Sequence, residues 1–187
     1  AEESDAKSLI DRIRSIATPL IDAVGVLPYA ALGAVHADPV DPMPTHESTA
    51  LTNELSHEAV DALLAAAGPG SGSPQTVVEL RLLGGALARE PEHRSAFCHR
   101  DAAFSLFTVG VLAPPMVDAV VPHAETLGRT MAPWTNGHAL PNFAPSVDPE
   151  KIARTYDEDT AHWLSALADT HDPQGVLAVG QVMRRIA

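Results

Sequence analysis

The sequence predicts an α+β fold, in which an antiparallel sheet of about four strands has helices packed on one face. The prediction rests on a pair of apolar, strand-like runs at 76–83 and 102–112. Segments 56–67 and 115–131 show the apolar spacing that is typical of helices. We therefore expect 76–83 and 102–112 to pair antiparallel at the centre of the sheet, joined by the loop at 84–101.

Residues of the first strand-like run alternate between an apolar face and a mixed face. Val78, Leu80 and Leu82 share the apolar face, whereas Glu79 and Arg81 share the other. An antiparallel strand commonly has one face on the core and one face toward water or a cavity. Glu79 and Arg81 are therefore either a solvent-exposed ion pair or two pocket-lining groups that orient a polar ligand.

The rest of the chain is predicted to contain further helices, loops and one or two strands. The first part has a helix capped by Ser4 or Asp5, a strand or extended segment at 20–27, a short helix or turn at 29–35, a proline-rich loop at 36–46 and a strand at 48–55. The later part has a helix at 115–131 that Pro122 should kink, an irregular segment at 136–145, a long helix at 148–168, a turn at 171–175, and a short strand or tail at 176–187. The glycine-rich stretch at 68–74 follows a helix and precedes a strand, so we interpret it as a linker and not as a phosphate loop.

Composition predicts a soluble globular protein. The chain has 187 residues, a hydrophobic fraction of 45% and a formal net charge of -12. The negative charge would repel phosphate backbones and anionic lipid, and no apolar run approaches the roughly 20 residues that a membrane span needs. We therefore expect neither nucleic acid nor a membrane as a partner. The single cysteine, Cys98, fits a cytoplasmic protein.

Few side chains form a recognisable catalytic or metal-binding motif. The spacing of His93, Cys98 and His99 matches no zinc pattern, so no metal site is predicted. Cys98 is expected to be a small buried hydrophobe, because no general base is directed toward it. His99 and Arg100 are either structural or pocket-lining, and periodicity alone does not decide between the two.

The loop that follows the first strand-like run reads GGALAREPEHRSAFCHR at 84–100. It resembles the segment G-G-A-x-x-R-x-P-x-x-x-x-A-F-x-H-R of FAD-linked oxidases of the berberine-bridge-enzyme type. Residues 140–143, LPNF, resemble the Tyr-x-Asn-Tyr segment of that family, and HDPQG at 171–175 resembles its Y-D-P-x-N turn. Because the segments VGVLPYAAL and LSHEAVDALLAAA also fit in order and spacing, the resemblance extends over nearly the whole chain.

The resemblance implies one part of such an enzyme. Residues 1–135 would be the latter part of a substrate-binding (cap) domain, and residues 136–187 a C-terminal segment that returns to the flavin domain. The histidine and cysteine to which flavin is covalently attached in many members belong to the N-terminal half, which this chain lacks, and Cys98 corresponds to neither. FAD is therefore the implied cofactor, but we do not expect this chain alone to bind it.

Departures from the family pattern remove several contacts with the flavin. Leu140 and Phe143 stand where tyrosines are common, and Gly175 stands where asparagine is usual. Asn142 is the remaining polar match and is the candidate cofactor-binding residue. No catalytic residue is assigned, and the candidates for the substrate pocket are Glu79, Arg81, His99 and Arg100.

The expected function is that of a substrate-domain portion or subunit of an FAD-dependent oxidoreductase. Such an enzyme would oxidise a small organic alcohol or amine, and a separate flavin-binding polypeptide would then be the partner. One alternative is a stand-alone truncated homologue that binds a small molecule without redox chemistry. Another is a structural domain that dimerises with a second copy of itself.

Overall fold

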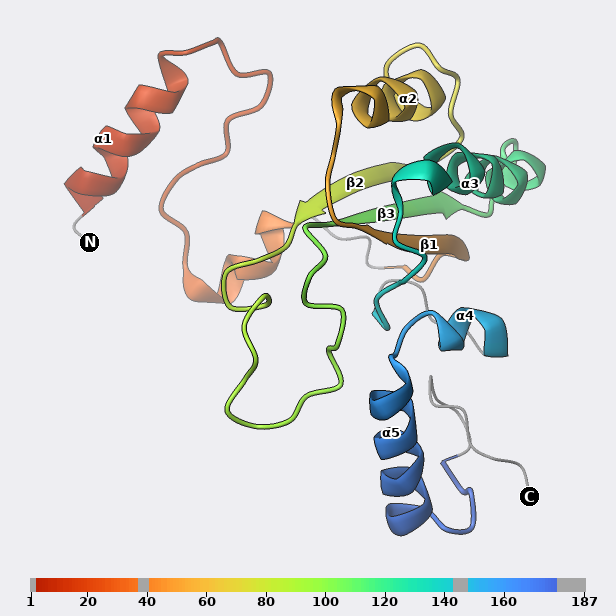
Figure 1. The fold of residues 1–187 in the computed structure, drawn as a ribbon. Helices are drawn as coiled ribbons and strands as arrows, with labels where there is room; N and C mark the ends of the chain where they lie inside the picture. The colour runs from red at the N-terminus through yellow and green to blue at the C-terminus, as the bar shows by residue number, and fades with distance from the viewer. Residues whose placement is uncertain (1–2, 37–40, 143–147, 178–187) are drawn as a thin grey trace. The chain divides into compact units, whose positions relative to one another are not determined.

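A computed structural model describes residues 3–36, 41–142 and 148–177. The chain forms two compact units, residues 1–42 and residues 43–187 (Figure 1). None of the helices in the described part of the chain is long and apolar enough to cross a membrane. All residues that were predicted to form a site belong to the second unit.

The first unit contains two helical segments and no strand among its described residues. Helix α1 (Glu3–Arg14) and the 3-10 helix η1 (Tyr29–Val35) agree with the predicted helices. The segment at 20–27 pairs with no strand, so the strand alternative for this segment is wrong. None of residues 4–36 is buried, so this part of the unit has no hydrophobic core of its own.

The second unit contains a three-stranded antiparallel sheet in the order β1-β3-β2 (Figure 1). Its strands are β1 (Thr45–Thr52), β2 (Val77–Leu82) and β3 (Phe104–Val111). The predicted antiparallel pairing is confirmed, because Val77 lies opposite Val109 and Leu82 lies opposite Phe104.

The sheet differs from the prediction in its number of strands and in the bounds of β1. It has three strands and not about four, because the segment at 20–27 has no strand partner. Strand β1 starts at Thr45, inside the segment that was predicted to be a loop, and residues 37–40 of that loop lie outside the described residues. Strand β3 is central, whereas β2 is an edge strand.

Helices α2 (His57–Ala67) and α3 (Val117–Met131) cover one face of the sheet, as predicted (Figure 1). The side chain of Ser56 caps α2 by accepting a hydrogen bond from the N–H of Ala59 at 3.2 Å. Leu82 is 75% exposed, so the predicted apolar face of β2 meets the core only in part. The core between helices and sheet is formed by Ala59, Leu63, Leu106, Leu127 and Met131, with Val78 and Leu80 packed against it.

Helix α3 lies directly on strand β3 at Gly110. A Cβ atom at this glycine would clash with Cγ1 of Val120, which is fully buried on α3. Any side chain at position 110 would therefore push the helix away from the sheet. Pro122 lies inside α3 without ending it.

The prediction of one long helix at 148–168 is wrong, because two helices occupy this region. Helix α4 (Pro149–Ala153) ends at a turn, and α5 (Glu158–His171) begins after it. The side chain of Asp157 accepts a hydrogen bond from the N–H of Thr160 at 2.7 Å, which starts a new helix. The 3-10 helix η2 (Ala132–Trp134) follows α3. The turn predicted after α5 is present. Residues 178–187 of the predicted tail lie outside the described residues.

We expect Leu127→Ala to lower the free energy of unfolding by about 3 kcal/mol, because the substitution leaves a cavity in the core. Leu127 is 1% exposed, whereas Leu82 is 75% exposed on an edge strand. Leu82→Ala is therefore the matched control and should cost less than about 1 kcal/mol. Urea denaturation followed by circular dichroism measures both values. Equal losses for the two variants would contradict this placement of the core.

Candidate functional site

The sheet face opposite α2 and α3 carries polar side chains from all three strands. We call the set Glu79, Arg81, Ser105 and Thr49 the polar row. Arg81 lies opposite Ser105 in the register of β2 and β3, and Glu79 lies opposite Phe107. The hydroxyl oxygens of Ser105 and Thr49 are 3.3 Å apart, which extends the row to β1.

Glu79 and Arg81 form a two-point ion pair at one end of the polar row. Nε of Arg81 donates to Oε1 of Glu79 at 2.6 Å, and Nη2 donates to Oε2 at 3.0 Å. The hydrogen bonds from Arg81 lower the pKa of Glu79, and the same bonds raise the pKa of Arg81, so both groups are charged at neutral pH. Their side chains are 39% and 36% exposed, so the pair is accessible to a ligand. The guanidinium carbon lies 5.5 Å from the centre of the Phe107 ring.

His99 is buried in the loop between β2 and β3 and stacks on His138. The ring centroids are 3.9 Å apart and the ring planes are inclined by 15°. Burial, and next the charge of His138, lower the pKa of His99, which favours its neutral form. Nε2 of His99 is buried without a hydrogen-bond partner among the described residues. His99 thus interacts with the ring of His138 and with the backbone at Thr155, and its role in a substrate pocket stays a prediction.

Arg100 holds the same loop together. Nη1 of Arg100 donates to the carbonyl oxygen of Leu87 at 2.8 Å and to that of Arg89 at 3.0 Å. Its guanidinium carbon lies 5.0 Å from the centre of the Phe97 ring. These contacts support a structural role for Arg100, while a role in binding substrate stays a prediction.

The thiol of Cys98 faces the backbone of the turn between α4 and α5. Sγ donates to the carbonyl of Thr155 at 3.7 Å and accepts from the N–H of Asp157 at 3.3 Å. Burial raises the pKa of the thiol above its ordinary value, so Cys98 is protonated at neutral pH. This environment favours packing over nucleophilic chemistry.

Asn142 is exposed in a bend, and the neighbouring Phe143 lies outside the described residues. A contact between Asn142 and a flavin therefore stays a prediction. Within the described part of the chain, no group of three or more His, Cys, Asp or Glu side chains could hold a metal ion.

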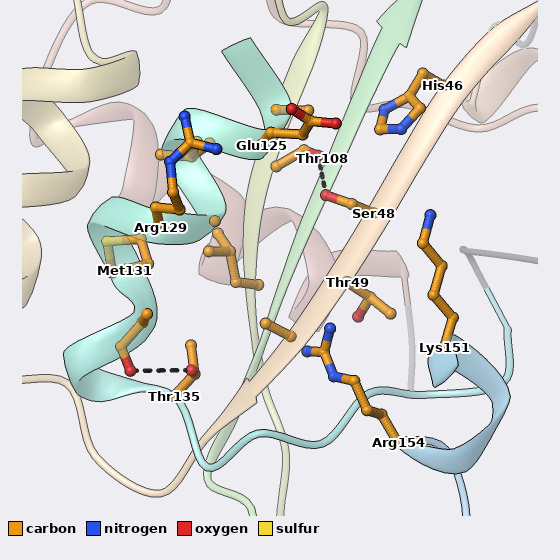
Figure 2. Close-up of a pocket in the computed structure, with 16 residues that line it drawn as sticks. His46, Ser48, Thr49, Thr108, Glu125, Arg129, Met131, Thr135, Lys151 and Arg154 are labelled. Carbon is orange, nitrogen blue, oxygen red and sulfur yellow. Dashed lines mark hydrogen bonds between the residues drawn. The ribbon is translucent and has the colours of Figure 1, made fainter. Parts of the chain in front are cut away.

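A groove with a volume of about 490 Å³ runs along the outer edge of β1, with α3 on one side and α4 on the other (Figure 2). We call it the edge groove. Inside it, the hydroxyl oxygens of Ser48 and Thr108 are 2.7 Å apart. No sequence motif indicates this groove, because its lining comes from separate segments of the chain. The charged residues that line it are Glu125, Arg129, Lys151 and Arg154.

No family model and no curated protein matches this chain, but solved structures do. The chain is similar to BBE-like 1 of Physcomitrella patens, with 17% identity and a TM-score of 0.64 for the wild type and 0.65 for a variant. Both matches cover 94% of this chain and 41% of the other. It is also similar to 6-hydroxy-D-nicotine oxidase of Arthrobacter nicotinovorans, with 20% identity, a TM-score of 0.60, and coverage of 93% and 40%.

These similarities confirm, at the level of the fold, the resemblance that the sequence motifs indicate. The chain has the fold of a part of the BBE-like structures. It spans about two fifths of their length, since 41% of the BBE-like 1 chain is covered.

We expect neutral His99 to make stability depend on pH. The pKa of His99 in the folded chain is lowered from its ordinary value of 6.5, so the unfolded chain binds the proton more readily. The contribution of His99 to the free energy of unfolding is therefore fully present above pH 6.5 and is lost as the pH falls below that value. His99→Phe keeps a ring for stacking but does not titrate, so its urea midpoint should fall less between about pH 7 and pH 5.

The control for this measurement is His93→Phe, which changes an exposed histidine in the same loop. His93→Phe should keep the pH dependence of the unmodified chain. If both variants show the same dependence as the unmodified chain, the buried position of His99 is wrong.

Proposed function

We propose that this chain is the substrate-binding portion of an FAD-dependent oxidoreductase, either as a fragment of a longer protein or as a subunit. The motif at 84–100 supports this proposal through its resemblance to oxidases of the berberine-bridge-enzyme type. The fold similarity supports it as well, because it covers 94% of this chain but 41% of the BBE-like 1 chain. A cytoplasmic location is part of the proposal, since a chain with one cysteine needs no oxidising compartment.

The polar row is the observation that carries the proposal. It places a carboxylate and a guanidinium beside the ring of Phe107, on the sheet face that α2 and α3 do not cover. A carboxylate accepts hydrogen bonds from a hydroxyl or an ammonium group, and a guanidinium donates to an oxygen. A small organic alcohol or amine is therefore the substrate class that we propose.

The ion pair within the polar row is compatible with ligand binding. Glu79 and Arg81 are both more than one third exposed, so water already competes for their hydrogen bonds. Exchanging part of that pairing for a ligand costs little free energy compared with breaking a buried pair. The pair thus fixes two charged groups on a rigid sheet while leaving them open to a ligand.

The described residues do not fit FAD by themselves. A dinucleotide needs a phosphate cradle, commonly a glycine-rich turn that leads from a strand into a helix. The glycine-rich stretch at 68–74 instead leads from α2 into β2. Asn142 is a single exposed amide in a bend. We therefore propose that a separate flavin-binding polypeptide, or a flavin-binding part of a longer protein, holds the cofactor.

The proposal is tested with the protein purified from its own cells through a tag on this chain. We expect the native complex to absorb between about 350 and 450 nm as flavoproteins do, and to release FAD on denaturation. The isolated chain, mixed with FAD and passed over a gel-filtration column, should stay colourless. A native complex without flavin would overturn the proposal and favour a stand-alone binding protein.

Variants of the polar row test its role within that complex. We expect Glu79→Gln to slow the loss of flavin absorption on adding an alcohol or amine substrate by at least about tenfold under anaerobic conditions. Glu92→Gln changes an exposed carboxylate in the loop between β2 and β3 and serves as the matched control. Equal rates for the two variants would show that the polar row does not face the substrate.

A further inference from the structure

The outer edge of β1 is filled at one point by the chain itself. The N–H of Leu51 donates to the carbonyl of His138 at 3.0 Å, and the N–H of Asn136 donates to the carbonyl of Leu51 at 2.9 Å. On the inner edge, the carbonyl of Thr52 accepts from the N–H of Ala103 at 2.9 Å. Successive residues of β1 therefore direct their backbone groups to opposite edges, as in any strand.

The same alternation leaves part of the outer edge of β1 open. Glu47 and Thr49 have the parity of Leu51, so their N–H and carbonyl groups point outward. No backbone hydrogen bond between described residues uses these outward groups. As far as the described residues go, 45–49 thus form an open strand edge, which is a template for pairing with another chain.

The edge groove lies along this open edge. Figure 2 shows β1 between α3, which carries Arg129, and the segment that carries Lys151 and Arg154. The groove has three cationic side chains and one carboxylate, Glu125, in a chain whose net charge is -12. None of the ion pairs between described residues includes Arg129, Lys151 or Arg154.

We propose that the edge groove binds an extended, acidic segment of another polypeptide, which adds to β1 as a strand at 45–49. Main-chain hydrogen bonds to Glu47 and Thr49 would supply affinity, and side-chain contacts would supply specificity. The side chains of an added strand alternate between the two faces of the sheet. Those on one face meet α3, and those on the other meet Lys151 and Arg154.

Charge decides which occupant fits. Acidic side chains on the α4 side complement Lys151 and Arg154, while side chains on the other face of the guest strand meet the wall formed by α3. A second copy of this chain would bring its own Arg129, Lys151 and Arg154 toward the same groove, and like charges brought together across an interface are unfavourable. The proposal concerns a protein partner and does not depend on flavin chemistry.

The probe is a fluorescein-labelled octapeptide that alternates valine with glutamate, and its binding is measured by fluorescence anisotropy. Glu47→Pro removes an outward N–H while it leaves the bonds to β3 in place. We expect it to weaken binding by at least about tenfold. Glu47→Ala keeps the N–H and removes a negative charge, so it should bind the peptide at least as tightly as the unmodified chain.

The contribution of charge is measured with the same peptide. Lys151→Glu should weaken binding by at least about tenfold, whereas Arg89→Glu, at an exposed position in the loop between β2 and β3, should leave it unchanged. A peptide that alternates valine with lysine should bind more weakly than the glutamate peptide. A peptide N-methylated at every residue provides a test that needs no variant, because it has no main-chain donor on either edge.

Several outcomes would overturn the proposal. If the glutamate peptide fails to bind at millimolar concentration, the cations only protect the edge from pairing. Equal binding of the N-methylated or the lysine peptide would likewise exclude an acidic strand. If sedimentation shows self-association that Glu47→Pro abolishes, the occupant is a second copy. Each of these results is obtained without flavin, so a failure of this proposal would leave the proposed function untouched.

Discussion

Strand β3 is the constraint on which the second unit depends. Its backbone pairs with β1 along one edge and with β2 along the other, so both neighbours take their register from it. Its side chains alternate between the two faces: Leu106 packs with the helices, whereas Ser105 and Phe107 belong to the opposite face. The same eight residues thus position both the hydrophobic core and the polar row.

Arg154 connects the closed part of the outer edge of β1 with the open part. The segment that fills the edge of β1 at Leu51 is itself held by Arg154, whose Nε donates to the carbonyl of Gly137 at 2.8 Å. The N–H of Ala139 in turn donates to the carbonyl of Arg154 at 3.0 Å. Arg154 therefore holds the segment that closes part of the strand edge, through its side chain and its backbone carbonyl, and it also lines the open remainder.

Local patterns predicted the features that depend on neighbouring residues. Alternation along 76–83 was enough to place the charged pair of β2 on the face away from the core. Ser105 and Thr49 join that pair only through the register between strands that are distant in sequence, which alternation does not report. The prediction of a single helix at 148–168 failed because the apolar spacing continues through a turn. At that turn the side chain of Asp157 caps a new helix.

Gly110 affects a surface that it does not touch. It lies opposite His46, which lines the edge groove, and it allows Val120 to rest on the backbone of β3. Because α3 forms one wall of that groove, the absence of a side chain at position 110 sets how far apart the walls stand. A substitution at Gly110 would change the width of the edge groove without changing any residue that lines it. The fit of a guest strand can therefore be altered in evolution by a residue that the guest never contacts.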